Sequence, residues 1–210
     1  MSDFDGAAMR RFVEIFADRI HERRDELTQL DSAIGDADHG TNMDRGFSAV
    51  RAKLGELEGT DPGVTAKAVG MTLISTVGGA SGPLYGTLFL RLATAFGDAS
   101  TVAPDVLGQA LRAALDGVRQ RGKAELDDKT MVDAMSPAVD AYEAACPEGI
   151  GPALEAAATA SAEGRDRVTP LVARKGRASY LGERAAGHPD PGATSTTILF
   201  ESLRDAVAGG

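Results

Sequence analysis

The chain has 210 residues, of which 43% are hydrophobic and 25% are charged, a globular balance that excludes an intrinsically disordered protein. Its formal net charge of -9 argues against non-specific binding to nucleic acid or to an anionic membrane. Cys146 is the only cysteine, so no internal disulfide can form, and a reducing, cytoplasmic location is expected. The acidic N-terminus lacks the apolar core of a signal peptide.

Helical periodicity runs along almost the whole chain, whereas alternating strand patterns are nearly absent. Apolar residues recur at helical spacing within 9–20, 47–54, 84–96 and 106–118. Further helical segments are predicted at 130–145, 151–163, 168–173 and 194–207. With about eight or nine helices and short connections, the pattern favours an all-α antiparallel bundle or ring. No linker or repeat interrupts it, so a single domain over residues 1–210 is expected.

One uncharged stretch, 68–90, is long enough to span a bilayer. Its centre reads Gly78-Gly79-Ala80-Ser81-Gly82-Pro83, which would break a spanning helix and leave backbone groups unsatisfied in lipid. The stretch is therefore predicted to form two buried helices joined by a glycine loop, with no membrane span.

The stretch "LDSAIGDADHGTNMDRGF" places Asp31, Asp36, Asp38 and His39 within nine residues. Like charges this close repel, so a nearby cation is expected to offset the repulsion. The aspartates are predicted to lie between two helical patterns, with a helix beginning near His39 or Gly40. Short carboxylates without soft ligands suit Mg²⁺, and the spacing fits neither an EF-hand nor a zinc site. From spacing alone, an acidic loop that merely caps helix ends is an equally good explanation.

Two further glycine-rich stretches, "VGGASGPLYG" and "GHPDPGATS", precede predicted helices, where free amides can bind phosphate. Alone the first stretch is a weak signal, because Gly-Ala-Ser-Gly runs are more often close helix contacts, and it matches neither a Walker A motif nor the dinucleotide fingerprint. The basic run "ARKGRASYLGER" is by itself most often a solvated face.

Taken together, these stretches and "QRGKAELDDKTM" resemble the nucleotide-binding L subunit of dihydroxyacetone kinase, of the phosphotransferase-system-dependent type. The matching motifs extend from near the N-terminus to the last predicted helix. The family fold is a ring of antiparallel α-helices with the nucleotide site at one end, which agrees with the periodicity.

The resemblance implies that Asp31, Asp36 and Asp38 bind two Mg²⁺ ions that hold the phosphates of ADP or ATP. It also implies that residues at the starts of two helices contact the phosphates and that others lie beside the nucleoside. A loop and a turn further along the chain are implied to close the site. These residues are His39, Gly40, Thr41, Asn42, Gly79, Ala80, Ser81, Gly122, Thr130, Met131, Arg177, Asp190, Pro191 and Gly192. No catalytic residue beyond this Mg-nucleotide site is expected on the chain.

The implied function is a phosphoryl relay. ADP stays bound as a fixed cofactor, a phosphotransferase-system donor subunit converts it to ATP, and a separate K subunit holds dihydroxyacetone covalently on its own histidine. His21 is predicted to be a surface residue and His188 a structural one. Two alternatives stay open: an ATP-exchanging kinase subunit for dihydroxyacetone or a related triose or tetrose, and a non-catalytic nucleotide-binding regulatory module. A homodimer is also left open.

Overall fold

The computed structural model describes residues 4–57 and 59–209, and most of these residues are helical. The α-helices are α1 (Gly6–Glu22), α2 (Arg24–Ile34), α3 (His39–Leu54), α4 (Pro62–Thr76), α5 (Ser81–Phe96), α6 (Pro104–Gly122), α7 (Met131–Ala145), α8 (Ile150–Val168) and α9 (Pro191–Ala208). Short 3-10 segments are η1 (Gly55–Leu57), η2 (Cys146–Glu148) and η3 (Arg177–Ala185). Strands β1 (Phe4–Asp5) and β2 (Thr101–Val102) form one small antiparallel pair. The all-α prediction is confirmed.

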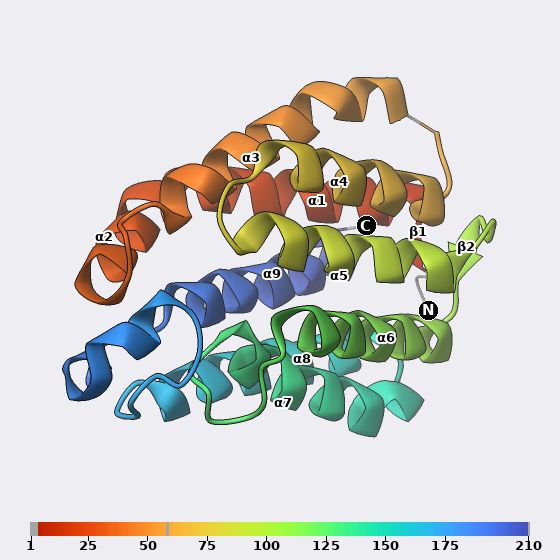
Figure 1. Cartoon of the computed structure of the whole chain (residues 1–210). Coiled ribbons are helices and arrows are strands. Elements are labelled where there is room, and N and C mark those ends of the chain that lie inside the picture. Colours follow the sequence, from red (N-terminus) through yellow and green to blue (C-terminus); the bar gives the residue numbers. More distant parts are fainter. Residues whose placement is uncertain (1–3, 58, 210) are drawn as a thin grey trace.

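The helices are arranged as a ring in which each one packs against the next along the chain. Contacts run from α1 to α3, then in order through α4, α5, α6, α7, α8 and α9, and α9 packs back against α1. Neighbours are antiparallel (Figure 1), so α3, α5, α7 and α9 all begin at the same end of the molecule. That end is therefore where four helix N-termini meet.

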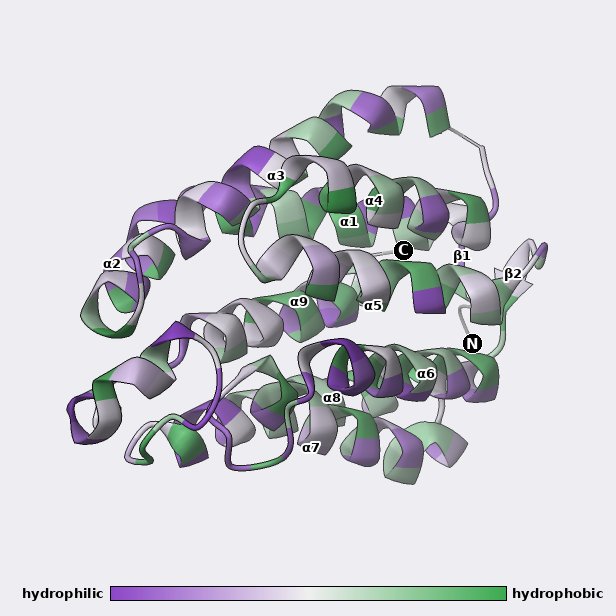
Figure 2. Ribbon diagram, in the orientation of Figure 1, coloured by the Kyte–Doolittle hydropathy of each residue, from purple (hydrophilic) through white to green (hydrophobic). Residues whose placement is uncertain are grey.

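The core follows from the apolar stripes of the sequence. In α1 the side chains of Phe12, Phe16 and Ile20 are at most 1% exposed, and the Phe16 ring meets Phe47 of α3 edge-on, with centroids 4.6 Å apart. Burying one such side chain contributes about 1.5–3 kcal/mol to folding. Figure 2 shows hydrophobic and hydrophilic positions interleaved along the helices, as expected when only one face of each helix packs inward.

Two predictions about secondary structure are wrong. The expected helix at 168–173 does not form, because α8 ends at Val168 and Pro170, two residues later, has no N–H to donate. Asp31 was expected in a loop but lies in the last turn of α2. This short helix buries only Leu27, Asp31 and Ile34, so its apolar periodicity is too weak to stand out in the sequence.

The uncharged stretch does form two helices, α4 and α5, joined by residues 77–80. They approach closely at Gly70 and Gly86, where an added Cβ would come within 3.0 or 3.1 Å of the other helix's backbone oxygen. The prediction that both helices are buried is wrong for the outer face of α4, where Met71 is 59% and Ile74 is 48% exposed. Among the described helices, none combines the length and apolarity that crossing a bilayer would require. The cytoplasmic location stays a prediction.

Candidate functional site

A cavity of about 250 Å³ lies at the end of the ring where the four helix N-termini meet. All the predicted site residues line it except Gly40, Thr41 and Asn42. The fold thus brings together stretches that lie far apart in the sequence: the acidic loop, the glycine loop before α5, the start of α7, η3 and the start of α9. Whether each residue contacts a nucleotide stays a prediction.

The helix ends make this cavity suited to an anion, because the peptide dipoles give each N-terminus a partial positive charge. Side chains already cap three of them: Thr130 forms a capping box with Asp133 at α7, Asp190 accepts from the Ala193 N–H at α9, and Asp31 accepts from the Asp38 and His39 N–H groups at α3. The start of α5 has no side-chain cap, and Gly79 before it has a φ of +64°. Its amide groups are therefore the best placed of the four to bind phosphate oxygens.

Asp31, Asp36 and Asp38 each offer a carboxylate oxygen, and these atoms all lie within 4.8 Å of one another. Asp31 is 7% exposed, and its Oδ2 accepts from the backbone N–H groups of Asp38 at 2.8 Å and His39 at 3.1 Å. The capping explanation therefore holds for Asp31, which joins α2 to the start of α3. It does not extend to Asp38, whose side chain makes no capping bond. An all-oxygen, hard donor set of this kind fits Mg²⁺.

A cation of the chain itself already meets this cluster. Arg177 Nε, at the start of η3, lies 2.7 Å from Asp36 Oδ2. Gly176, with a φ of +67°, turns the backbone before it. The pairing shows that the position beside Asp36 accommodates positive charge.

The side chain of His39 is engaged within the protein, and its contact with a phosphate stays a prediction. Its ring is buried, with Nδ1 3.1 Å from Ser81 Oγ and Nε2 2.9 Å from Ser195 Oγ. Burial lowers the pKa of His39 to about 4, and Asp31 and Asp38 offset this only in part. The neutral ring must donate through one nitrogen and accept through the other. His39 therefore ties together the starts of α3, α5 and α9, and the Ser195 hydroxyl extends this network to Tyr85 at 2.7 Å.

The three predicted residues outside the cavity support its walls. A Cβ on Gly40 would lie 2.0 Å from the Arg24 carbonyl oxygen, so Gly40 permits α3 to pack closely on α2. Thr41 donates its hydroxyl to the Asp38 carbonyl oxygen. Asn42 lies beside the glycine loop, where its Oδ1 would be 3.1 Å from a Cβ on Gly78.

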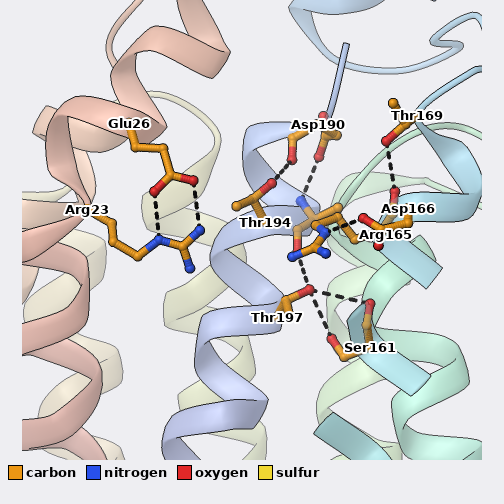
Figure 3. Close-up of polar contacts among 10 residues, drawn as sticks. Arg23, Glu26, Ser161, Arg165, Asp166, Thr169, Asp190, Thr194 and Thr197 are labelled. Carbon is orange, nitrogen blue, oxygen red and sulfur yellow. Dashed lines mark hydrogen bonds and ion pairs between the residues drawn. The ribbon is translucent and has the colours of Figure 1, made fainter. Parts of the chain in front are cut away.

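Asp190 is the most strongly perturbed acid of the cavity. Burial raises its pKa to about 7, although the Ala193 N–H donates to Oδ2 at 2.7 Å. The Thr194 hydroxyl donates to the Asp190 carbonyl oxygen, and one turn further the Thr197 and Ser161 hydroxyls join α9 to α8 (Figure 3). These bonds fix the start of α9 in the cavity wall.

Sequence reasoning missed part of the lining. Apolar side chains of Leu84, Val118 and Val132 face the cavity and suit a flat, weakly polar group. Lys129 also lines it and is only 1% exposed. Its motif was recognised, but a lysine in a charged loop is usually solvated, and nothing in the local sequence signals its burial.

Residues 33–205 match the DAK2 domain. The chain belongs to this family. Over 84% of its length, this DAK2-domain chain is 48% identical to the ADP-binding subunit DhaL of PEP-dependent dihydroxyacetone kinase from Escherichia coli, and the match covers 85% of that subunit. It is 42% identical to the corresponding subunit of dihydroxyacetone kinase 1 from Listeria innocua, over 92% of both chains.

The fold of the DAK2-domain chain is also found in a solved structure, the dihydroxyacetone kinase of C. freundii in complex with AMP-PNP and Mg²⁺. The TM-score is 0.71 at 22% identity, and the match covers 98% of this chain. The chain spans about a third of that kinase, 35% of its length. This similarity supports the helical ring seen here.

Proposed function

We propose that this DAK2-domain chain is the ADP-binding subunit of a phosphoenolpyruvate-dependent dihydroxyacetone kinase. The observation that carries the proposal is the meeting, in one cavity, of the carboxylates of Asp31, Asp36 and Asp38 with the uncapped start of α5. The first set binds cations and the second binds anions, so a metal-bound polyphosphate satisfies both. The identity to subunits of this kind supports the assignment of the nucleotide as ADP.

Two Mg²⁺ ions are proposed at the three aspartates. Held by these carboxylates, Mg²⁺ would neutralise negative charge on the phosphates. Two ions bring four positive charges against three carboxylates and a diphosphate, which is a better balance than one ion gives. Asp31 keeps Oδ1 for this role, because its Oδ2 already accepts two backbone N–H groups.

The protein groups of the cavity position the nucleotide and do not react with it. The amides of Gly79, Ala80 and Ser81 can bind phosphate oxygens, and Arg177 can pair with a phosphate in place of Asp36. The apolar wall at Leu84 and Val118 suits the base. Both nitrogens of the neutral His39 ring are already engaged, so it is not proposed as an acid or base. Phosphoryl transfer through positioning and electrostatics needs no such group.

The proposed partners follow from the relay. A phosphotransferase-system donor subunit would phosphorylate the bound ADP, and a separate K subunit would hold dihydroxyacetone covalently as the acceptor. If ADP binds with a nanomolar dissociation constant and an on-rate of about 10⁶ M⁻¹s⁻¹, the complex lasts on the order of a quarter-hour. A typical turnover takes well under a second, so ADP can act as a fixed cofactor.

The test loads the purified chain with labelled ADP and adds the phosphorylated donor subunit, then K subunit and dihydroxyacetone. The label should become ATP and return to ADP without leaving the protein, even with excess unlabelled ATP present. Rapid loss of the label, with turnover on free ATP alone, would contradict the fixed-cofactor cycle. Absence of any nucleotide binding would contradict the proposed function itself.

A further inference from the structure

The side chain of Lys129, in the loop between α6 and α7, is almost fully buried, at 1% exposure. Its Nζ donates to three backbone carbonyl oxygens: Thr169 at 2.8 Å, Leu171 at 2.9 Å and Ala185 at 2.6 Å. An ammonium group has three hydrogens, so these bonds use all of them. The buried charge is therefore engaged entirely with one segment of backbone.

That segment, residues 169–187, makes up most of the connection from α8 to α9 and forms one wall of the cavity through Lys175, Gly176, Arg177 and Ala178. It has little packing of its own. Its buried apolar residues form a small cluster with Ile34, separate from the main core, and η3 is interrupted at Gly182 by a φ of +57°. A segment with so few apolar contacts opens easily unless other bonds hold it.

The carbonyls that Lys129 holds lie at the two ends of this wall. Leu171 precedes the cavity-lining residues and Ala185 follows them, so one ammonium group fixes both ends of residues 172–184. Two backbone hydrogen bonds hold the ends of the same segment, from Gly187 N–H to the Thr169 oxygen and from Arg174 N–H to the Asp128 oxygen.

The loop that carries Lys129 is itself well anchored. The Asp133 carboxylate, which is fully buried, accepts from the N–H groups of Thr130 at 2.8 Å and Asp127 at 2.6 Å. Thr130 and Met131, which follow Lys129 in the chain, line the cavity. Lys129 therefore connects a rigid cavity wall to one that is held by few contacts.

We propose that Lys129 is a positioning residue of the nucleotide site, whose ammonium group clamps the ends of residues 172–184 and so keeps Arg177 at the cavity. Only the expected effect of this clamp on nucleotide release rests on the proposed function. Its effect on the backbone of residues 172–184 is expected in the nucleotide-free chain as well.

The test compares Lys129→Met with Lys123→Met. Lys123 and Lys129 both have left-handed backbone, with φ of +51° and +62°, and each change removes one positive charge and leaves an unbranched side chain. Lys123, unlike Lys129, is exposed. In limited trypsin digestion of the nucleotide-free chain, Lys129→Met should accelerate cleavage at Arg174, Lys175, Arg177 and Arg184 about tenfold or more, with helical circular dichroism unchanged. Lys123→Met should be cleaved in this segment as slowly as the wild type.

The nucleotide measurement is separate. Release of bound ADP should be about tenfold faster or more in Lys129→Met and unchanged in Lys123→Met. A second variant, Lys129→Gln, keeps two N–H donors on a shorter side chain and should give intermediate cleavage and release. This graded rescue is not expected if Lys129 only fills space.

Three outcomes would overturn the clamp: wild-type cleavage of residues 174–184 in folded Lys129→Met, equal behaviour of the Met and Gln variants, or global loss of helicity in both. The last would show that Lys129 supports the whole ring. If no variant or wild type binds ADP, the proposed function fails, while the digestion pattern still decides the clamp.

Discussion

Arg177 and Asp36 form an ion pair, Nε to Oδ2 at 2.7 Å, that joins the start of η3 to the turn between α2 and α3. The Arg177 side chain is 66% exposed and that of Asp36 is 33% exposed. Such a pair contributes at most about 1 kcal/mol to folding, because water screens it. The pair matters because it places the exposed guanidinium of Arg177 beside a carboxylate that is proposed to bind metal.

Arg177→Ala should therefore change ligand binding far more than stability. We expect ADP affinity in the presence of Mg²⁺ to fall about tenfold, the equivalent of one charge-assisted contact, while the melting temperature of the nucleotide-free chain moves by only about 1–3 °C. Calorimetric titration and thermal unfolding measure the two effects. Arg51→Ala, which removes a similarly exposed pair with Asp18, is the control and should leave affinity unchanged. An equal loss of affinity in both variants would count against a role for Arg177.

The proposed metal ligands Asp31 and Asp36 differ in the hydrogen bonds that they make within the protein, so their variants should differ in stability. Asp36→Asn removes a ligand charge but no capping bond, so Mg-dependent ADP retention should fall sharply while the nucleotide-free chain loses at most about 1 kcal/mol, from the ion pair with Arg177. Asp31→Asn also weakens the bonds to the N–H groups of Asp38 and His39, so it should lose both retention and about 1 kcal/mol of stability.

Chelation gives the matching measurement for these aspartates. EDTA should lower the melting temperature of the ADP-loaded wild type strongly and that of Asp36→Asn little, because a ligand stabilises only the state that binds it. Asp25→Asn, at a side chain 85% exposed on α2, should respond as wild type does. Full ADP occupancy in purified Asp36→Asn would show that the aspartate assignment is wrong.

The two ends of α5 offer a matched pair of glycines. Gly79 before the helix and Gly97 after it both have left-handed backbone, with φ of +64° and +56°. Valine at either position should cost about 1–2 kcal/mol, because a β-branched residue is strained there. Only Gly79→Val should also abolish ADP binding, since only that loop lines the cavity. Thermal unfolding and ADP titration of both variants test this, and equal binding by the two would exclude a phosphate contact at Gly79.

Asp190 should make stability depend on pH. Its pKa is raised from 3.8 to about 7 by burial, so between these values the folded chain binds a proton that the unfolded chain has released. The free energy of unfolding should therefore fall as the pH rises through this window. Asp190→Asn, which keeps an oxygen for the Ala193 N–H, should remove that loss.

The measurement is denaturant unfolding of nucleotide-free, metal-free protein. One pKa unit is worth about 1.4 kcal/mol, so the advantage of Asp190→Asn over wild type should grow by on the order of 2 kcal/mol between about pH 5 and pH 8. Asp98 is exposed, and Asp98→Asn serves as the control. Its free energy of unfolding should change with pH as that of wild type does. A constant difference across this range would show that the Asp190 carboxyl is not destabilised by burial.

The sequence by itself determined an all-α bundle or ring from periodicity, and its resemblance to a known family indicated most of the cavity residues. Apolar side chains such as Phe12 and Phe16 repeat with the period of a helix, and that period is a local property of the chain. Short motifs around Asp36, Gly79 and Asp190 could be recognised for the same reason, since each lies within a few residues. The sequence did not reveal α2, whose polar composition hides its periodicity, and it suggested a helix at 168–173 where Pro170 ends one.

Only the tertiary structure decided which groups meet. Arg177 and Asp36 are brought into contact because η3 folds over the turn before α3. His39 turned out to be a neutral, buried link between three helices, and Asp31 a cap as well as a candidate ligand. Lys129 became a three-way donor to a distant segment. Burial and long-range hydrogen bonds depend on neighbours far along the chain, so no local pattern encodes them.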